Sequence, residues 1–149
     1  MTGGYAGKFL EVDLEKEKIE NKVFPEEILR NYLGGRALAT KILWDRLGSK
    51  WEGVDPLGSE NIFLALTGPL TGYYPGMRIC VSGKSPLTNG IVGSTVAAEF
   101  PLELKCAGYD GVIVTGRAKK PVYIFIGDDK VEVRSAMRLW GKDGKQTIR

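Results

Sequence analysis

The sequence contains no histidine and only two cysteines, Cys80 and Cys106, which do not form a CxxC pair. Structural zinc and iron–sulfur sites use about four Cys or His ligands, so a self-contained site of either kind is excluded. Without histidine, the Ser-His-Asp and Cys-His arrangements of hydrolases are excluded within these residues as well. We predict that both cysteines are buried thiols in a reducing cytosol, which places the protein in the cytoplasm.

Long apolar runs and basic runs are also missing. No apolar stretch approaches the ~20 residues that a membrane-spanning helix needs, and the N-terminus lacks the basic and apolar regions of a signal peptide. The 21 Lys and Arg residues are scattered among 18 acids, which argues against nucleic acid as a partner. We therefore expect no membrane and no nucleic-acid interaction, and the 149 residues suffice for one globular domain.

The hydrophobic pattern mixes hairpins with helices and shows no regular alternation of strand and helix. It predicts a hairpin over 8–23, helices from Pro25 and over 36–47, strands over 62–66, 77–82 and 91–93, a helix over 95–106, a strand over 111–115 and a hairpin over 122–134. This is an α+β fold. A helix could start within 139–149, but its apolar face is not completed. We expect residues 1–149 to be a partial or truncated domain, or a subunit that docks elsewhere.

The stretch from Thr67 to Asp110 carries the candidate binding residues. Its two Gly/Pro-rich loops adjoin short apolar strands, and on the strand over 77–82 Arg78 is the one charged residue. A guanidinium binds phosphate through two parallel hydrogen bonds, and glycine lets backbone N–H groups approach an anion. Ser94 and Thr95, expected just before a helix, would add N–H groups at its positive end. The alternatives are a solvated arginine at 78 and an ordinary helix cap at 94–95.

Nucleotide-binding motifs are missing, because neither a P-loop nor a G-x-G-x-x-G occurs. Three acids, Glu99, Glu103 and Asp110, are metal carboxylates or, as we expect, solvated helix and cap charges. Leu43 and Trp44 are expected to pack in the core, with an aromatic contact to a cofactor as the alternative.

Short blocks spread over the chain resemble the amino-terminal domain of the tungsten-containing aldehyde:ferredoxin oxidoreductase family. The blocks are LGGRALA at 33–39, PL and SEN within 56–61, TGPLTG at 67–72, KSPLT at 84–88, ELKCAGYD at 103–110, GRA with PVY within 116–123, and LWGK at 139–142. Each block is short, but they follow the family order and cover essentially the whole chain.

The resemblance implies an oxidoreductase that converts aldehydes to carboxylic acids with ferredoxin as electron acceptor. It implies a tungsten (or molybdenum) bis-pyranopterin cofactor, a magnesium ion bridging the pterin phosphates and a nearby [4Fe–4S] cluster. This domain would be the floor on which the cofactor lies. Arg78 matches the family arginine, while Thr95 and Ala97 stand at the Asn and Gly of the family's Asn-x-Gly segment. Assembly as a homo-oligomer stays open.

The second cofactor-binding half, the cluster cysteines and the catalytic acid and base of the family have no counterpart in these residues. We therefore expect no catalytic residue here and no activity of the 149 residues alone. Two other functions stay open: a stand-alone cofactor-binding or protein-interaction module without catalysis, and a relative that acts on an aromatic acyl-CoA. The metal and the substrate are not distinguished, because substrate contacts lie elsewhere in the family.

Overall fold

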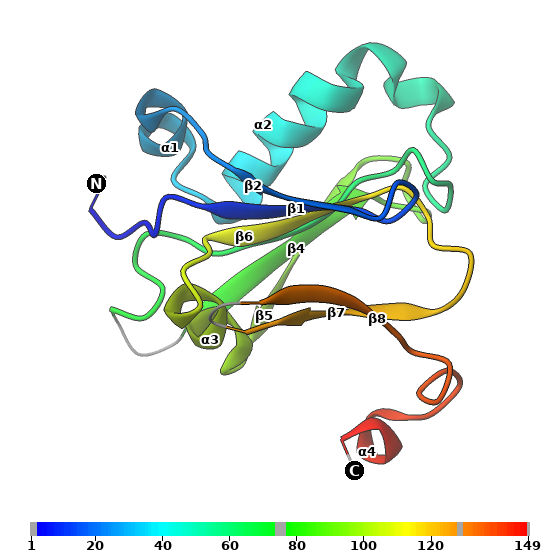
Figure 1. Cartoon of the computed structure of the whole chain (residues 1–149). Coiled ribbons are helices and arrows are strands. Elements are labelled where there is room, and N and C mark those ends of the chain that lie inside the picture. The colour runs from blue at the N-terminus through cyan, green and yellow to red at the C-terminus, as the bar shows by residue number, and fades with distance from the viewer. Residues whose placement is uncertain (1–2, 74–76, 128–129, 149) are drawn as a thin grey trace.

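The computed structural model describes residues 3–73, 77–127 and 130–148. A six-stranded mixed sheet lies at its centre, with the two helices nearest the N-terminus on one face and a short helix with a small hairpin on the other (Figure 1). The strands are β1 Phe9–Asp13, β2 Lys18–Lys22, β3 Phe63–Leu66, β4 Arg78–Lys84, β5 Ile91–Ala97, β6 Gly111–Thr115, β7 Val122–Ile126 and β8 Val131–Ser135. The helices are α1 Glu26–Tyr32, α2 Gly35–Leu47, the 3₁₀ helix η1 Gly48–Gly53, α3 Phe100–Cys106 and α4 Gly144–Thr147. The predicted α+β fold is confirmed.

The order of strands in the large sheet is β2-β1-β6-β3-β4-β5. Its one parallel pair joins β1 to β6, the first and the last strand of this sheet in chain order, with Phe9 opposite Gly111. The other neighbours are antiparallel, and β7 and β8 form a separate two-stranded sheet. Both predicted hairpins are therefore present, although residues 128–129 between β7 and β8 lie outside the described residues.

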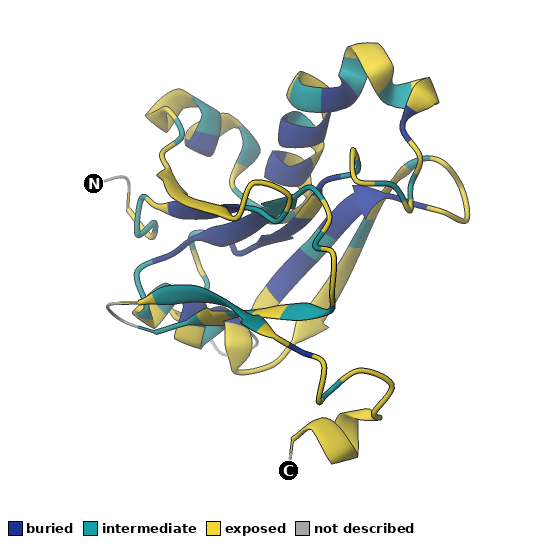
Figure 2. Ribbon diagram, turned by 45° about the vertical axis from the view of Figure 1, so that its right-hand side comes forward, coloured by how far each residue is buried: buried dark blue, intermediate teal, exposed yellow. Residues whose placement is uncertain are grey.

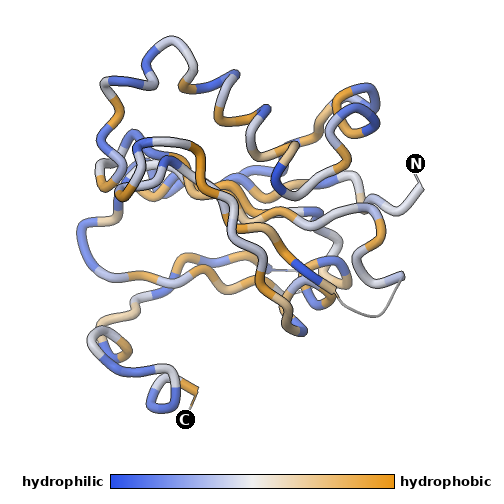
Figure 3. Tube along the Cα trace, turned by 180° about the vertical axis from the view of Figure 1, so that it is seen from behind, coloured by the Kyte–Doolittle hydropathy of each residue, from blue (hydrophilic) through white to orange (hydrophobic). Residues whose placement is uncertain are grey.

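Alternation along the strands gives each face of the sheet its own apolar core. The helical face packs against α1 and α2 and contains Phe9, Leu29, Leu38, Leu43, Leu64, Leu66 and Ile113. The hairpin face packs against α3 and the β7–β8 hairpin and contains Leu10, Val12, Ala65, Ile79, Leu104 and Val112. Burial and hydropathy follow this arrangement, with the central strands buried and apolar (Figures 2 and 3). Each buried Leu or Ile contributes about 1.5–3 kcal/mol, so packing on the sheet holds α2 in place.

The helix boundaries follow the predicted signals. Pro25 precedes α1, and the acids Glu26 and Glu27 lie in its first turn, beside the positive end of the helix dipole. The chain leaves α1 through Leu33 in the left-handed conformation, and α2 begins two residues later. The predicted helix over 36–47 is thus confirmed to within one residue.

The predicted helix over 95–106 is wrong in its first half. The chain continues as β5 through Ala97, because its Val and Thr residues pair with β4 in an unbroken register from Ile91 onward. Helix α3 begins only at Phe100, which places Pro101 in the first turn rather than at a kink inside a longer helix. Proline suits that position because the first N–H groups of a helix have no partner within the helix.

Two side-chain predictions are also wrong. Cys80 is buried as expected, but Cys106 is exposed at the end of α3. Leu43 packs in the core, whereas Trp44 is 70% exposed because it faces away from the sheet on α2. Its ring packs near Gly48 instead.

The segment after β8 extends away from the body of the molecule (Figures 1 and 2). It holds one exposed helical turn, α4, with a reciprocal capping box between Asp143 and Gln146. A helix within 139–149 was predicted, and only this short turn forms. Among residues 3–73, 77–127 and 130–148, no helix has the length and apolar character required to cross a bilayer.

Candidate functional site

The pairing of β4 with β5 brings the predicted binding residues together. Arg78, at the start of β4, lies opposite Ala97, and Cys80 lies opposite Thr95. Directly paired residues, and those two apart on a strand, share a face of the sheet. Cys80 pairs on its other side with Leu66 of the helical core. Arg78, Thr95 and Ala97 therefore all belong to the helical face, and all are exposed.

Thr95 does not, however, act as a helix cap. It lies inside β5, and the residue that precedes α3 is Glu99. The prediction that the 94–95 segment supplies N–H groups at a helix N-terminus is wrong, because the backbone there is extended and paired with β4. Helix α2 supplies such groups to this face instead.

The N-terminus of α2 lies beside β4 and the loop that follows β3. The amide of Gly35 donates to the carbonyl oxygen of Thr67 at 2.9 Å. A β-carbon on Gly35 would stand 3.7 Å from that of Cys80, two residues along β4 from Arg78. The first turn of a helix carries partial positive charge and N–H groups without partners in the helix. Helix α2 therefore adds positive potential to the same end of the sheet as Arg78.

Gly34 allows this close approach. Its φ is +96°, and a β-carbon at this position would lie 2.4 Å from the carbonyl oxygen of Thr67. Any other residue would strain the backbone and push the start of α2 away from the loop. Gly34 thus sets the distance between α2 and the sheet.

Asp110 anchors the other side of this loop. Its carboxylate accepts hydrogen bonds from the amides of Ala6 and Gly7 at 3.0 and 2.6 Å, and it pairs with Lys105 Nζ at 2.5 Å. Its backbone oxygen accepts both the hydroxyl and the amide of Thr67, at 2.7 and 2.9 Å. With 1% of its side chain exposed, Asp110 is not the solvated charge that was predicted. Its burial among donors ties the N-terminal segment, α3 and the glycine-rich loop together.

Tyr5 belongs to the same network. Its hydroxyl donates to the carbonyl oxygen of Leu29 at 3.1 Å. Burial and, second, the negative charge of Asp110 raise the pKa of Tyr5 above its ordinary value. The centre of the Tyr5 ring also lies 5.5 Å from Lys105 Nζ, so the face of the ring attracts that cation.

The acids give no metal site of their own. Within the part of the chain that the structure describes, no group of three or more Cys, Asp or Glu residues could hold a metal ion. Glu103 lies in α3, Glu99 stands at its N-cap position without a capping hydrogen bond from its side chain, and Asp110 is engaged as above. The carboxylate alternative for these three residues is therefore not supported.

The surface around Arg78 suits a large anionic group. The small side chains of Thr95 and Ala97 lie exposed on the helical face of β5, while Gly93 is covered by the side chain of Arg36. Within the described residues Arg78 forms no ion pair, so its guanidinium can bind an anion. An exposed guanidinium without an ion pair, set among small side chains, is suited to bind an anion.

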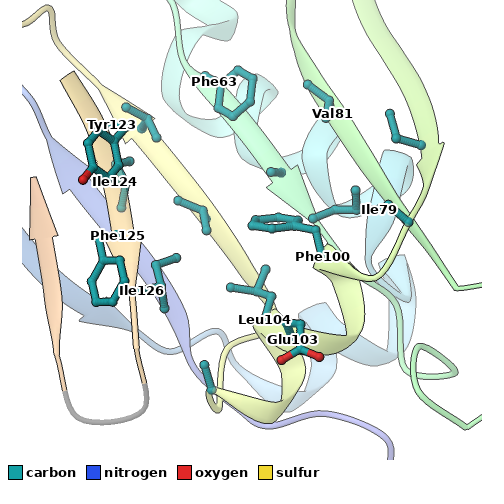
Figure 4. Close-up of a pocket in the computed structure, with 16 residues that line it drawn as sticks. Phe63, Ile79, Val81, Phe100, Glu103, Leu104, Tyr123, Ile124, Phe125 and Ile126 are labelled. Carbon is teal, nitrogen blue, oxygen red and sulfur yellow. The ribbon is translucent and has the colours of Figure 1, made fainter. Parts of the chain in front are cut away.

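A cavity of about 590 Å³ lies on the opposite face, between the sheet, α3 and β7 (Figure 4). Its lining is almost entirely apolar, including Phe63, Phe100, Ile124 and Ile126, and Glu103 is the one charged residue in it. The sheet separates this cavity from Arg78. A phosphate would lose its hydration there without gaining a cation, so we do not assign the anion site to it.

Sequence reasoning missed two cations of the helical face. Arg36, in the first turn of α2, donates from Nη2 to the carbonyl oxygen of Gly93 at 2.5 Å. Lys84 is buried, and its ammonium donates to the carbonyl oxygens of Trp51 and Val54 at 2.5 and 2.8 Å. A basic residue directly after a Gly-Gly pair was a usable signal for Arg36. The burial of Lys84 could not be predicted from local sequence, because lysine is rarely found inside proteins.

Most of the chain is similar to members of one protein family. The family model described as "Aldehyde ferredoxin oxidoreductase, N-terminal domain" matches residues 9–149. A protein of Pyrococcus furiosus named "Aliphatic sulfonate oxidoreductase, WOR-like subunit" is 56% identical over 140 residues, which are 94% of this chain and 22% of that protein. A "Tungsten-containing aldehyde ferredoxin oxidoreductase" of the same organism is 40% identical over 146 residues, or 97% of this chain and 24% of that protein.

A solved structure shares the fold. The "Active site complex BamBC of Benzoyl Coenzyme A reductase in complex with 1,5 Dienoyl-CoA" superposes with a TM-score of 0.91 at 38% identity, covering 99% of this chain and 22% of that one. The chain therefore spans about a quarter of the length of the relatives it matches.

Proposed function

This chain belongs to the aldehyde ferredoxin oxidoreductase family, and we propose that it forms one phosphate-binding part of the tungstopterin site in a larger oxidoreductase. The observation that carries the proposal is the placement of Arg78 opposite Ala97 and beside the Thr95–Cys80 pair, on the open face next to the N-terminus of α2. Family membership makes a tungstopterin the expected cofactor, and the exposed cationic surface matches its phosphate.

In this proposal each residue of the chain has a limited task. Arg78 donates two hydrogen bonds to a pterin phosphate and neutralises its charge. The edge-strand residues Thr95 and Ala97 offer backbone groups, which do not depend on the side chains that replace the family's Asn and Gly. The positive end of α2 favours negative charge at the same end of the sheet. When bound, the cofactor supplies two-electron redox chemistry, and the protein supplies binding and electrostatics.

A [4Fe–4S] cluster, the ferredoxin contact and the substrate pocket would be formed by polypeptide outside these residues, and a magnesium ion would be bound at the pterin phosphates. The chain by itself is then inactive. For the complete oxidoreductase we propose oxidation of an aldehyde to a carboxylic acid. An aliphatic sulfonate is the second candidate substrate, favoured by the 56% identity to the relative of that name. Assays of the complete enzyme with one substrate of each class and a low-potential dye as acceptor would decide between them.

The phosphate contact is tested by Arg78→Ala in the complete oxidoreductase. Loss of a charge-assisted hydrogen bond costs about 1.5–3 kcal/mol, so tungsten and pterin per protein should fall by about tenfold or more. Arg138→Ala, at an exposed arginine in the segment after β8, is the matched control and should leave both unchanged. Full tungsten content in Arg78→Ala would refute the proposed role.

A further inference from the structure

The first turn of α2 is attached to the outer strand of the sheet by a single side chain. The guanidinium Nη2 of Arg36 lies 2.5 Å from the carbonyl oxygen of Gly93 in β5. The two residues are 57 positions apart in the sequence. A hydrogen bond from a charged donor is stronger than one between neutral groups. This single contact therefore holds the helix to the strand more strongly than a neutral hydrogen bond would.

Gly93 is shaped for this contact. A β-carbon at position 93 would lie 2.6 Å from Nε of Arg36 and about 3.0 Å from its Cγ. The arginine side chain thus crosses β5 at Gly93, the one residue of this strand that has no side chain. The φ of Gly93 is not in the left-handed region, so the requirement for glycine is steric and comes from Arg36.

Strand β5 depends on such a contact because it lies at the edge of the sheet. It pairs with β4 only, and six of its seven residues are exposed. Edge strands have half the hydrogen-bond partners of central strands and open more easily. Gly93, Thr95 and Ala97 lie on the same face, two residues apart, with Arg78 opposite Ala97. The arginine contact therefore holds the strand two residues before the first proposed cofactor contact.

We propose that Arg36 is a positioning residue of the cofactor site, which holds β5 through the carbonyl oxygen of Gly93 and so keeps the backbone of Thr95 and Ala97 beside Arg78. The cofactor part of this inference rests on the function proposed above. Arg36 does not contact the cofactor in this arrangement. Its effect passes through Gly93, and a glycine at 93 is as necessary as the arginine.

Hydrogen exchange of the 149-residue chain tests the contact without any cofactor. In Arg36→Ala and in Gly93→Ala, the amides of 94–97 should exchange about tenfold faster, as expected when a charged hydrogen bond no longer resists local opening. Arg36→Lys, which keeps a donor, should recover part of the protection. Lys41→Ala removes a cation from the same helix, where it pairs with Asp45, and should leave these amides unchanged. Unaltered exchange in Arg36→Ala and Gly93→Ala would overturn the contact.

Tungsten content of the complete oxidoreductase tests the positioning role. Gly93→Ala displaces the side chain of Arg36 but keeps its charge. Equal loss of tungsten in Gly93→Ala and Arg36→Ala, with partial recovery in Arg36→Lys, supports positioning. Loss of tungsten in Arg36→Ala alone overturns the positioning role, because Arg36 would then act by its charge.

Normal tungsten in both Arg36→Ala and Gly93→Ala, together with loss in Arg78→Ala, also overturns the positioning role but leaves the proposed phosphate site intact. Normal tungsten in Arg78→Ala refutes the phosphate site. The hydrogen-exchange measurements then still test the contact between Arg36 and Gly93, because they need no cofactor.

Discussion

At the scale of single residues, several polar groups do structural work inside the molecule. Lys84 is the clearest case, since 4% of it is exposed and its ammonium reaches two carbonyl oxygens at the end of η1. The same ammonium lies 5.2 Å from the centre of the Trp51 ring. The cost of burying the charge is offset by these oxygens and by the aromatic face.

Replacing Lys84 by methionine should therefore destabilise the fold. The apolar side chain fills similar space but leaves the carbonyl oxygen of Val54 without its donor, at about 1–3 kcal/mol for an unsatisfied buried group, while the carbonyl oxygen of Trp51 keeps the bond from the amide of Val54 at 3.3 Å. The midpoint of urea unfolding should fall accordingly. Lys50→Met, at an exposed lysine of η1, is the control and should change the free energy of unfolding by less than about 0.5 kcal/mol. An unchanged midpoint in Lys84→Met would contradict this account.

At the scale of elements, α2 is the helix that organises the helical face. Its apolar side buries Leu38, Ile42 and Leu43, its N-terminus rests on Thr67, and its last turn is tied to the sheet. The contact is a bidentate salt bridge, in which Arg46 Nη1 and Nη2 donate to the two carboxylate oxygens of Glu11 at 2.6 and 2.9 Å. The hydrogen bonds from Arg46 hold the pKa of Glu11 below its ordinary value, more than burial raises it.

The pair predicts a pH dependence of stability. Because the pKa of Glu11 is lower in the folded state, its contribution is present above the unfolded value of 4.5 and is lost as the pH falls through the folded value. Glu11→Gln should therefore destabilise the chain at neutral pH and make little difference in acid below the folded pKa. Denaturant unfolding at a series of pH values would measure this. Glu26→Gln, which breaks an exposed pair with Arg30, should have little effect throughout, and an equal effect of the two substitutions would count against the prediction.

The elements were largely predictable because most carry local signals. The hairpins, α1 and α2 followed from alternation, helical spacing and the residues Pro25 and Gly34. The boundary between β5 and α3 did not, since Thr95 to Ala97 has small and branched residues that suit either state, and pairing with β4 decides between them. The grouping of Arg78, Thr95 and Ala97 came from the family resemblance, and the β4–β5 register accounts for it. The roles of Asp110 and Lys84 depend on partners far away in the sequence, which no local pattern reveals.

At the scale of the whole molecule, the two faces of the sheet differ in character. The helical face is closed by α1 and α2 except for the cationic end near Arg78. The hairpin face is covered incompletely, and apolar side chains at the rim of its cavity stay exposed, among them Phe63 at 50% and Phe100 at 51% (Figure 4). An exposed apolar surface of this kind binds apolar molecules from water.

The 149-residue chain should therefore bind the dye ANS in its folded state, through this cavity. Phe100→Lys should lower the dye fluorescence, because it removes an aromatic wall and adds a charge at the rim. Leu57→Lys, at a residue that is 74% exposed and outside the cavity lining, should leave the signal as it is. Equal loss in both variants, or none in Phe100→Lys, would show that the dye binds elsewhere.

The parallel pairing of β1 with β6 determines when this fold can be completed on the ribosome. Phe9 pairs with Gly111 and Asp13 with Thr115, so the first strand to be synthesised has to wait for one of the last strands of the large sheet. Until then the nascent chain can form the β1–β2 hairpin, but Leu10 and Val12 have no sheet or α3 to cover them. Leu10 and Val12 therefore gain their cover only when β6 inserts between β1 and β3.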